Sequence, residues 1–313
     1  MRTYNHIRVF LFHRIAENRE NWAHPTGVKI FEKCLQYITG NFTVKTVEEC
    51  LALQGSEIKG KGRPLAALTF DDGFRDNIKY ALPLLEKYKC PASFYIVTDC
   101  IDSGLPTWQH LFQNLFHNTK KLRLDVSDAY FAGGINKTFA DARERIAYGN
   151  KLLGQLYTSP GCGAVKVMEE VTRNFNDVPV PERMTMTWDE LRQLSSAGYT
   201  IGSHTCSHPL LTQLQDAYIR KELVESAERI EKVCRKRPGT IAYPLGVTDN
   251  RVQVIAQECG YKYGLSVEQK FYNHSEHHSM AVPRVDVYAG HNWLKTYLRM
   301  TGDLEKVKRV LGR

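Results

Sequence analysis

Two adjacent carboxylates are the first residues whose types and spacing could do chemistry. The apolar run from Leu65 to Phe70 stops at Asp71 and Asp72, and a glycine follows them. Two neighbouring carboxylates repel each other unless a cation or a shared proton lies between them. Asp-Asp-Gly is also an ordinary turn sequence, because both residue types are common in turns. Taken alone, the pair leaves a turn and a reactive site open.

A pair of histidines offers these carboxylates a partner. His204 and His208 lie four residues apart, and this spacing lets two imidazoles converge on one cation from a helical turn or a tight loop. Two histidines and one carboxylate leave coordination positions free for water and substrate. One carboxylate of the Asp71–Asp72 pair can complete the set, and its neighbour then stays free as a base. The combination predicts a catalytic metal site.

The segments that position these residues alternate between predicted strands and predicted helices. Runs at helical spacing separate most of the short apolar runs. This alternation is typical of a parallel α/β fold, and short strands that end in polar residues favour a barrel over an open sheet. The predicted strands are residues 7–12, 65–70, 92–97, 199–203, 240–243 and 261–267.

The alternation stops between residues 102 and 183, where we expect helices and no strand. The sequence therefore predicts a barrel made of residues 1–101 and 184–313, with residues 102–183 inserted as a helical subdomain on the active-site side. Trp108 and the phenylalanines after it in the same predicted helix are expected to pack between helices. A role for these aromatic side chains in shaping the substrate pocket is the alternative.

The composition describes a globular protein with a basic surface. The 313 residues carry a formal net charge of +8, and 42% of them are hydrophobic. No nucleic-acid motif accompanies the basic runs, so we expect no nucleic-acid partner. The eight cysteines include no Cys-x-x-Cys pair, which favours free thiols in a reducing compartment. Neither a signal peptide nor a run of the ~20 apolar residues that span a membrane is recognisable, so we expect a cytoplasmic protein.

Three motifs resemble those of the polysaccharide deacetylase family, which is also called the NodB-homology family or carbohydrate esterase family 4. Thr69-Phe-Asp-Asp-Gly73 resembles the first motif, His204-Thr-Cys-Ser-His208 the second and Ile241-Ala-Tyr-Pro-Leu-Gly246 the third. The resemblance covers nearly the whole chain outside the insertion. It implies a distorted (β/α)7 barrel and the metal-dependent removal of acetyl groups from amino sugars.

The resemblance also implies a role for each residue of these motifs. Asp71 is the expected general base, and Asp72, His204 and His208 are the expected metal ligands. The backbone N–H of Tyr243 is the expected oxyanion donor beside the metal. The expected cofactor is a divalent metal ion, first of all Zn²⁺, with Co²⁺ and Ni²⁺ as alternatives.

Two positions depart from the usual family pattern. The arginine that usually starts the third motif is missing, because Thr240 begins a stretch without one, and a late histidine motif is missing near the C-terminus. His13, which ends the apolar run Val9–Phe12, and Arg284 resemble the replacements in the circularly permuted branch of the family. His13 is then the expected general acid, and Arg284 is expected to orient Asp71. Core packing or a surface role for His13 is the alternative.

Together these expectations define a function. The protein is expected to hydrolyse an N-acetyl group on an amino sugar of a glycan or glycan precursor during surface-polysaccharide biosynthesis. Its partner is an acetylated amino sugar or glycan, and a peripheral contact with a membrane or a lipid-linked glycan stays open. Two alternatives remain: a metal-dependent hydrolase of another amide on the same scaffold, and a non-catalytic glycan-binding module.

Overall fold

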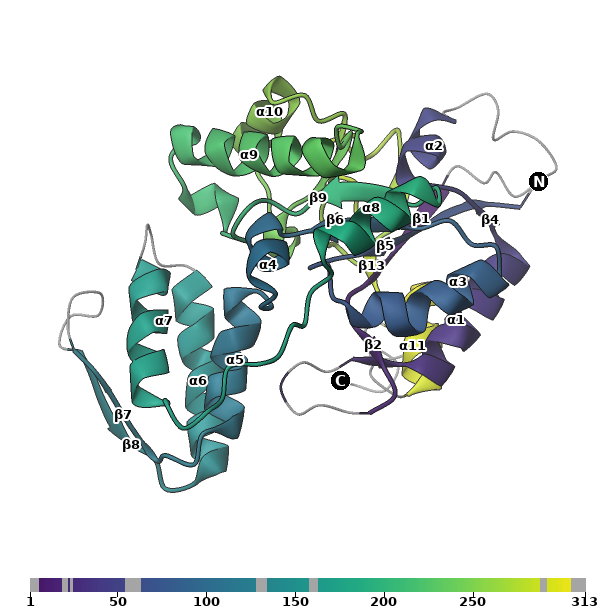
Figure 1. The fold of residues 1–313 in the computed structure, drawn as a ribbon. Coiled ribbons are helices and arrows are strands. Elements are labelled where there is room, and N and C mark those ends of the chain that lie inside the picture. The colour runs from purple at the N-terminus through teal and green to yellow at the C-terminus, as the bar shows by residue number, and fades with distance from the viewer. Residues whose placement is uncertain are drawn as a thin grey trace.

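A computed structural model of the chain shows two lobes, one built on a curled sheet and a smaller one that contains α5, α6 and α7 (Figure 1). None of the described helices has the length and hydropathy of a membrane span. The cysteines of the described segments are free thiols, as expected. The structure describes residues 6–18, 22, 25–53, 63–127, 134–157, 163–287 and 292–304.

A nine-stranded sheet organises the larger lobe. Its central path is β11–β10–β9–β6–β5–β1, and each pair along this path is parallel. Parallel strands need crossover connections, which the helices between them supply. The strands of this path are β1 (His6–Phe12), β5 (Leu65–Phe70), β6 (Ser93–Ile96), β9 (Thr200–Ser203), β10 (Thr240–Ala242) and β11 (Tyr263–Leu265).

One segment near the end of the chain joins the two sides of the curled sheet. Leu265 of β11 forms a parallel bridge with Val282, and β13 (Val285–Asp286) pairs in parallel with β1 at Phe10. β12 (Tyr272–Asn273) runs antiparallel beside the start of β1. This curled parallel sheet confirms the α/β barrel that the sequence predicts.

Helices pack around the sheet, with α9 and α10 above the strands and α1, α3 and α11 below them in Figure 1. The main core lies around Phe70 and Phe94, which face each other on β5 and β6 with ring centroids 5.0 Å apart. The helices of this lobe are α1 (Val28–Asn41), α2 (Val47–Ala52), α3 (Leu82–Lys87), α4 (Thr98–Ser103), α8 (Trp188–Ser196), α9 (Asp216–Cys234), α10 (Asn250–Glu258) and α11 (Trp293–Thr301).

Shorter elements complete this lobe. A π-helical segment precedes α3, and 3-10 turns precede α9 and α10. Thr187 begins α8 with a capping box, in which its hydroxyl accepts from the Glu190 N–H and the Glu190 carboxylate accepts from the Thr187 N–H. The sequence pattern also predicts a helix at residues 303–311, which lie almost wholly outside the described residues. The short elements are β2 (Ile15–Ala16), β3 (Thr26–Gly27), β4 (Thr43–Val44) and the turns Asn77–Ala81, Leu211–Gln213 and Pro244–Gly246.

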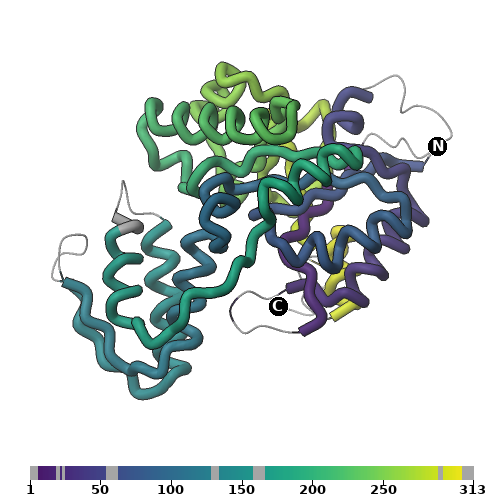
Figure 2. Tube along the Cα trace, in the orientation of Figure 1, coloured from purple at the N-terminus to yellow at the C-terminus, as the bar shows by residue number. Residues whose placement is uncertain are grey.

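The smaller lobe has a hydrophobic cluster of its own, to which Phe112 and Phe116 contribute buried rings. In Figure 2 the chain leaves this lobe after α7 and returns to the sheet at α8. The limits of residues 102–183 as a separate domain stay a prediction. The elements of the lobe are α5 (Trp108–Asn118), α6 (Ala142–Tyr157), α7 (Gly163–Asn174), β7 (Arg123–Val126) and β8 (Ile135–Thr138).

The expectation of a strand-free insertion is wrong, because β7 and β8 form an antiparallel hairpin. Leu124 and Val126 are buried while Arg123 and Asp125 are exposed, which is the period of two that a half-buried strand requires. Only four residues alternate in this way. A pattern of that length is hard to distinguish from a loop between helices.

Candidate active site

The residues singled out from the sequence meet at the carboxyl end of the parallel strands. Asp71 and Asp72 follow β5, His204 follows β9 and His13 follows β1. These four side chains and that of His208 line one cavity of about 360 Å³. Ligand pockets in proteins commonly fall in a range that includes this volume.

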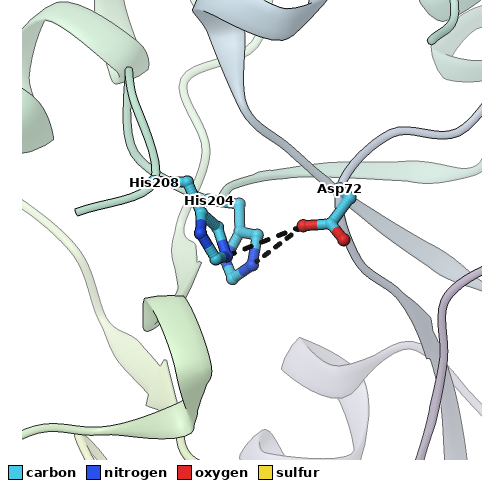
Figure 3. A group of neighbouring side chains, drawn as sticks. All are labelled: Asp72, His204 and His208. Atoms are coloured by element: carbon cyan, nitrogen blue, oxygen red, sulfur yellow. Dashed lines mark ion pairs between the residues drawn. The ribbon is translucent and has the colours of Figure 1, made fainter. Parts of the chain in front are cut away.

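Asp72, His204 and His208 form the buried cluster shown in Figure 3. The Oδ1 atom of Asp72 lies 3.6 Å from Nε2 of His204 and 3.7 Å from Nε2 of His208. Candidate ligand atoms of the three residues all lie within 4.8 Å of one another. Within the described segments, Asp72 Oδ1, which faces both imidazoles, is buried without a hydrogen-bond partner. Since buried polar atoms normally have partners, a cation among these three groups fits the donor set.

Backbone contacts orient both imidazoles. Nδ1 of His204 lies 2.7 Å from the Ala242 carbonyl oxygen, which can only accept, so Nδ1 carries the proton and Nε2 keeps its lone pair toward Asp72. The backbone N–H of His208 donates to Thr205 Oγ1 at 3.1 Å and fixes the main chain that carries the second imidazole. Burial lowers the pKa of His208 to about 3, so the ring is neutral near pH 7, the form that binds metal ions.

Unusual backbone angles bring the ligands together. Asp72, Thr205 and His208 have positive φ values of 68°, 70° and 60°. Such values are uncommon for residues with a side chain and cost energy. These positive φ values lie just after β5 and β9, where the chain must turn sharply so that the side chains of Asp72, His204 and His208 converge.

Arg284 holds the second carboxylate, Asp71. Its Nη1 donates to Asp71 Oδ1 and its Nη2 to Asp71 Oδ2, both at 2.7 Å. Arg284 is fully buried, and Asp71 is nearly so. Burial raises the pKa of Asp71, but the Arg284 guanidinium, together with the nearby His204 and His13, outweighs burial and lowers this pKa to about 2. The Asp71 carboxylate is therefore ionised and held at two points, 3.8 Å from His204 Nε2.

The expectation for the Tyr243 N–H is wrong. This N–H donates to the Leu265 carbonyl at 3.0 Å in the pairing of β10 with β11, so it is not free for an oxyanion. Leu245, two residues on, lines the cavity and has a φ of 59°. The hydrogen bonds of this turn use the Gly246 and Val247 N–H groups, so we assign the oxyanion donor to the N–H of Leu245.

His13 lines the cavity, and its role as general acid stays a prediction. This residue directly follows Phe12, whose carbonyl accepts from the Asp71 N–H at 3.0 Å. The end of β1 is thereby tied to the start of the first motif. The alternative of a core-packing histidine does not fit a cavity-lining residue that is only half-buried.

The smaller lobe contributes a histidine that sequence reasoning missed. Nδ1 of His110, on α5, lies 3.9 Å from Asp72 Oδ2 and 2.8 Å from Thr107 Oγ1. Burial lowers the pKa of His110 to about 4, so its ring is neutral near pH 7. Gln109 and Gln113 line the same cavity. This polar stripe on an otherwise apolar predicted helix was the available signal.

The start of α5 also contacts the histidine motif directly. The Gln109 side-chain amide and the Trp108 indole N–H donate to the His208 carbonyl at 3.2 and 3.4 Å. Of the aromatic residues in this helix, Trp108 therefore contacts the histidine motif, while Phe112 and Phe116 pack in the cluster of the smaller lobe. Trp108 also packs against that cluster. Helix packing is thus present for all three residues, and none of the three lines the catalytic cavity.

Fold and site together define a class, that of α/β barrels with a His-His-Asp cluster next to an arginine-held carboxylate. The sequence profile of the polysaccharide deacetylase family matches residues 59–123 and 165–264, just over half of the chain, and the protein belongs to this family. Membership makes it a carbohydrate deacetylase. The matched segments omit the centre of the smaller lobe. No curated protein matches the sequence.

Solved structures of deacetylases share the fold. The Streptococcus pyogenes deacetylase PplD, in complex with acetate, aligns with a TM-score of 0.63 at 17% identity over 94% of this chain and 98% of its own. IcaB from Ammonifex degensii aligns with 0.58 at 13% identity over 95% and 97%. A de-N-acetylase from Aggregatibacter actinomycetemcomitans aligns with 0.55 at 14% identity over 94% and 100%. At these identities the likeness shows the fold alone.

Proposed function

We propose that the protein is a metal-dependent deacetylase that hydrolyses the N-acetyl group of an amino sugar in a glycan or glycan precursor. One observation carries the proposal: the arginine-held carboxylate of Asp71 lies beside a buried set of ligand atoms, of which Asp72 Oδ1 has no hydrogen-bond partner among the described residues. A base and an electrophile site at this separation suit the attack of water on an amide.

Asp72, His204 and His208 would hold the metal ion. Two imidazoles and one carboxylate suit Zn²⁺, and Co²⁺ or Ni²⁺ would accept the same donors. When bound, the ion would polarise the acetyl carbonyl and lower the pKa of a water molecule.

The remaining residues act on protons and charge. Asp71 accepts the proton of the attacking water, and Arg284 keeps its carboxylate ionised and fixed in orientation. The Leu245 N–H donates to the oxyanion that develops on the acetyl oxygen. His13 donates a proton to the departing amine, and histidine is the side chain that most often acts as a general acid or base.

The shape of the cavity supports a sugar-sized substrate. Its lining mixes ionisable groups with the aromatic face of Trp22, next to His110. Polar groups that fix orientation beside apolar contact surface are usual in small-ligand pockets. PplD was solved with acetate, the acid that a deacetylation releases. A role in surface-polysaccharide biosynthesis and a cytoplasmic location remain predictions from the sequence.

Acetate release from a panel of N-acetylated amino sugars and non-sugar acetamides tests the proposal. Metal-loaded protein should release acetate from at least one sugar, and the Asp71→Asn variant should not. Asp189→Asn, at an exposed position of α8, is the matched control and should behave like the wild type. Equal release from simple acetamides would identify a different amide hydrolase, and no release by folded, metal-loaded protein would favour a binding module.

A further inference from the structure

A second cavity, of about 710 Å³, adjoins the catalytic cavity. Its walls come from α5, α6 and α7 of the smaller lobe and from the loop after His208. This volume, like that of the catalytic cavity, is in the range of ligand pockets. The aliphatic side chains of its lining are Leu111, Leu156, Met168, Leu210 and Leu214.

The two cavities share a wall. Tyr157 lines both of them, and Trp108, whose ring centroid lies 5.9 Å from that of Tyr157, lines the second. The Trp108 indole N–H donates to the carbonyl of His208, a candidate metal ligand. Ser207 and Pro209, on either side of His208, line the second cavity. A ligand bound in the catalytic cavity beside His208 would therefore also lie beside the second cavity.

The chemistry of the two linings differs. Carboxylates and imidazoles surround the catalytic cavity, whereas aliphatic side chains dominate the second one. Leu111 and Leu210 are half-buried and belong to no hydrophobic cluster of the described residues, so core packing does not account for them. The polar residues of the second lining are Glu169, Thr172, Arg173, Ser207 and Gln213. Against the aliphatic part of the wall the hydroxyl groups of a further sugar ring would be unpaired, which costs free energy, whereas a hydrocarbon chain would not.

We infer that the substrate is an acetylated amino sugar that carries a hydrocarbon chain, with the sugar in the catalytic cavity and the chain in the apolar one. This inference rests on the proposed deacetylase function. The aromatic side chains of the second lining are those of Trp108 and Tyr157, and its aliphatic part suits a flexible chain better than a flat ring. The protein then acts on a lipid-linked sugar rather than on a bare polymer.

Chain length in the substrate tests the inference. The octyl and methyl glycosides of one N-acetylated amino sugar are compared below the micelle concentration. The octyl glycoside should have a kcat/KM at least about tenfold higher, since each methylene removed from water contributes about fourfold and two suffice. Equal values for the two glycosides would overturn the inference while leaving the deacetylase function intact.

Two variants assign the effect to the apolar cavity. Leu111→Gln and Leu210→Gln keep the approximate side-chain size but make the wall polar, and each should lower the octyl-to-methyl ratio of kcat/KM by about threefold or more. Leu294→Gln on α11, where the side chain is 66% exposed, should leave the ratio unchanged. A ratio that falls equally in all three variants would contradict the assignment.

A binding measurement separates this inference from the proposed function. An octyl glycoside brominated along its chain should quench the fluorescence of Trp108, and Trp108→Phe should remove that part of the quenching. Chain-dependent quenching without turnover would contradict the deacetylase function and support the apolar subsite. Turnover without quenching would support the deacetylase function and contradict the apolar subsite. Equal quenching by a brominated alcohol that lacks the sugar would overturn the inference, since the chain would then bind independently of the sugar.

Discussion

Replacement of Arg284 by methionine removes the group that keeps Asp71 ionised inside the protein. The two side chains share two 2.7 Å hydrogen bonds, and both are buried. Methionine fills much of the same space without a charge or a donor. The variant therefore leaves a buried carboxylate without its partner.

The size of the effect follows from the pKa of Asp71. This pKa is lowered from 3.8 to about 2, and a shift of that size corresponds to about 2 kcal/mol of stability. That contribution is present above pH 3.8 and is lost as the pH falls toward 2. Breaking a buried pair costs more, about 3–5 kcal/mol, because the remaining charge is uncompensated. We expect Arg284→Met to lower the free energy of unfolding by about this amount at pH 7.

The variant should also reverse the sign of the pH dependence. Without Arg284, burial raises the pKa of Asp71 above its unfolded value, so the folded state binds the extra proton. The free energy of unfolding should then rise as the pH falls through the raised pKa. In the wild type, Asp71 instead lowers the free energy of unfolding as the pH falls.

Denaturant unfolding of metal-free protein between pH 4 and 8 measures this effect, together with kcat/KM and metal content at pH 7. Arg284→Met should lose at least about 10²-fold in turnover, since an oriented base typically contributes 10²–10⁴, while the metal content stays near that of the wild type. The double variant Asp71→Asn/Arg284→Met removes both charges and should recover most of the lost stability. A single variant that loses under 1 kcal/mol and keeps its turnover would refute the argument.

Four further predictions concern the metal cluster and its neighbours. Asp71→Asn should keep the metal and lose most turnover, whereas Asp72→Asn should lose the metal itself; an equal loss of metal in both would contradict this division. Chelation should abolish activity, and added Zn²⁺ or Co²⁺ should restore it. Full activity of verified metal-free protein would disprove metal dependence. His13→Ala should lose about 10²–10⁴-fold on an acetamide but less on an acetyl ester with a good leaving group; equal losses would exclude an acid role. His110→Phe should bind metal more weakly by calorimetry, and unchanged affinity would show that His110 does not support Asp72.

Local sequence patterns were sufficient for the strands and for the residues that follow them directly. The apolar run before Asp71 and the run before His13 both end where parallel strands end, so their final side chains had to share one edge of the sheet. Arg284 could be placed on Asp71 although 213 residues separate them, because it resembles the late arginine of the circularly permuted branch of the family. The resemblance thus predicted a contact that periodicity could not.

The sequence was insufficient where the answer depends on which hydrogen bonds are already in use. Tyr243 and Leu245 lie in the same motif and both have an N–H, but the pairing of β10 with β11 takes the first. That register is set by three paired residues of each strand, and neighbouring registers look alike in the sequence. His110 was missed for a different reason, because its approach to Asp72 depends on how α5 docks against the loop at His208. The barrel and its metal cluster follow from patterns within single strands, whereas the pocket that selects the substrate follows from the docking of two lobes. We therefore expect changes at Trp108, Leu111 and Leu210 to alter the preference for a long over a short hydrocarbon chain, and changes at Asp71 to alter whether any substrate is hydrolysed.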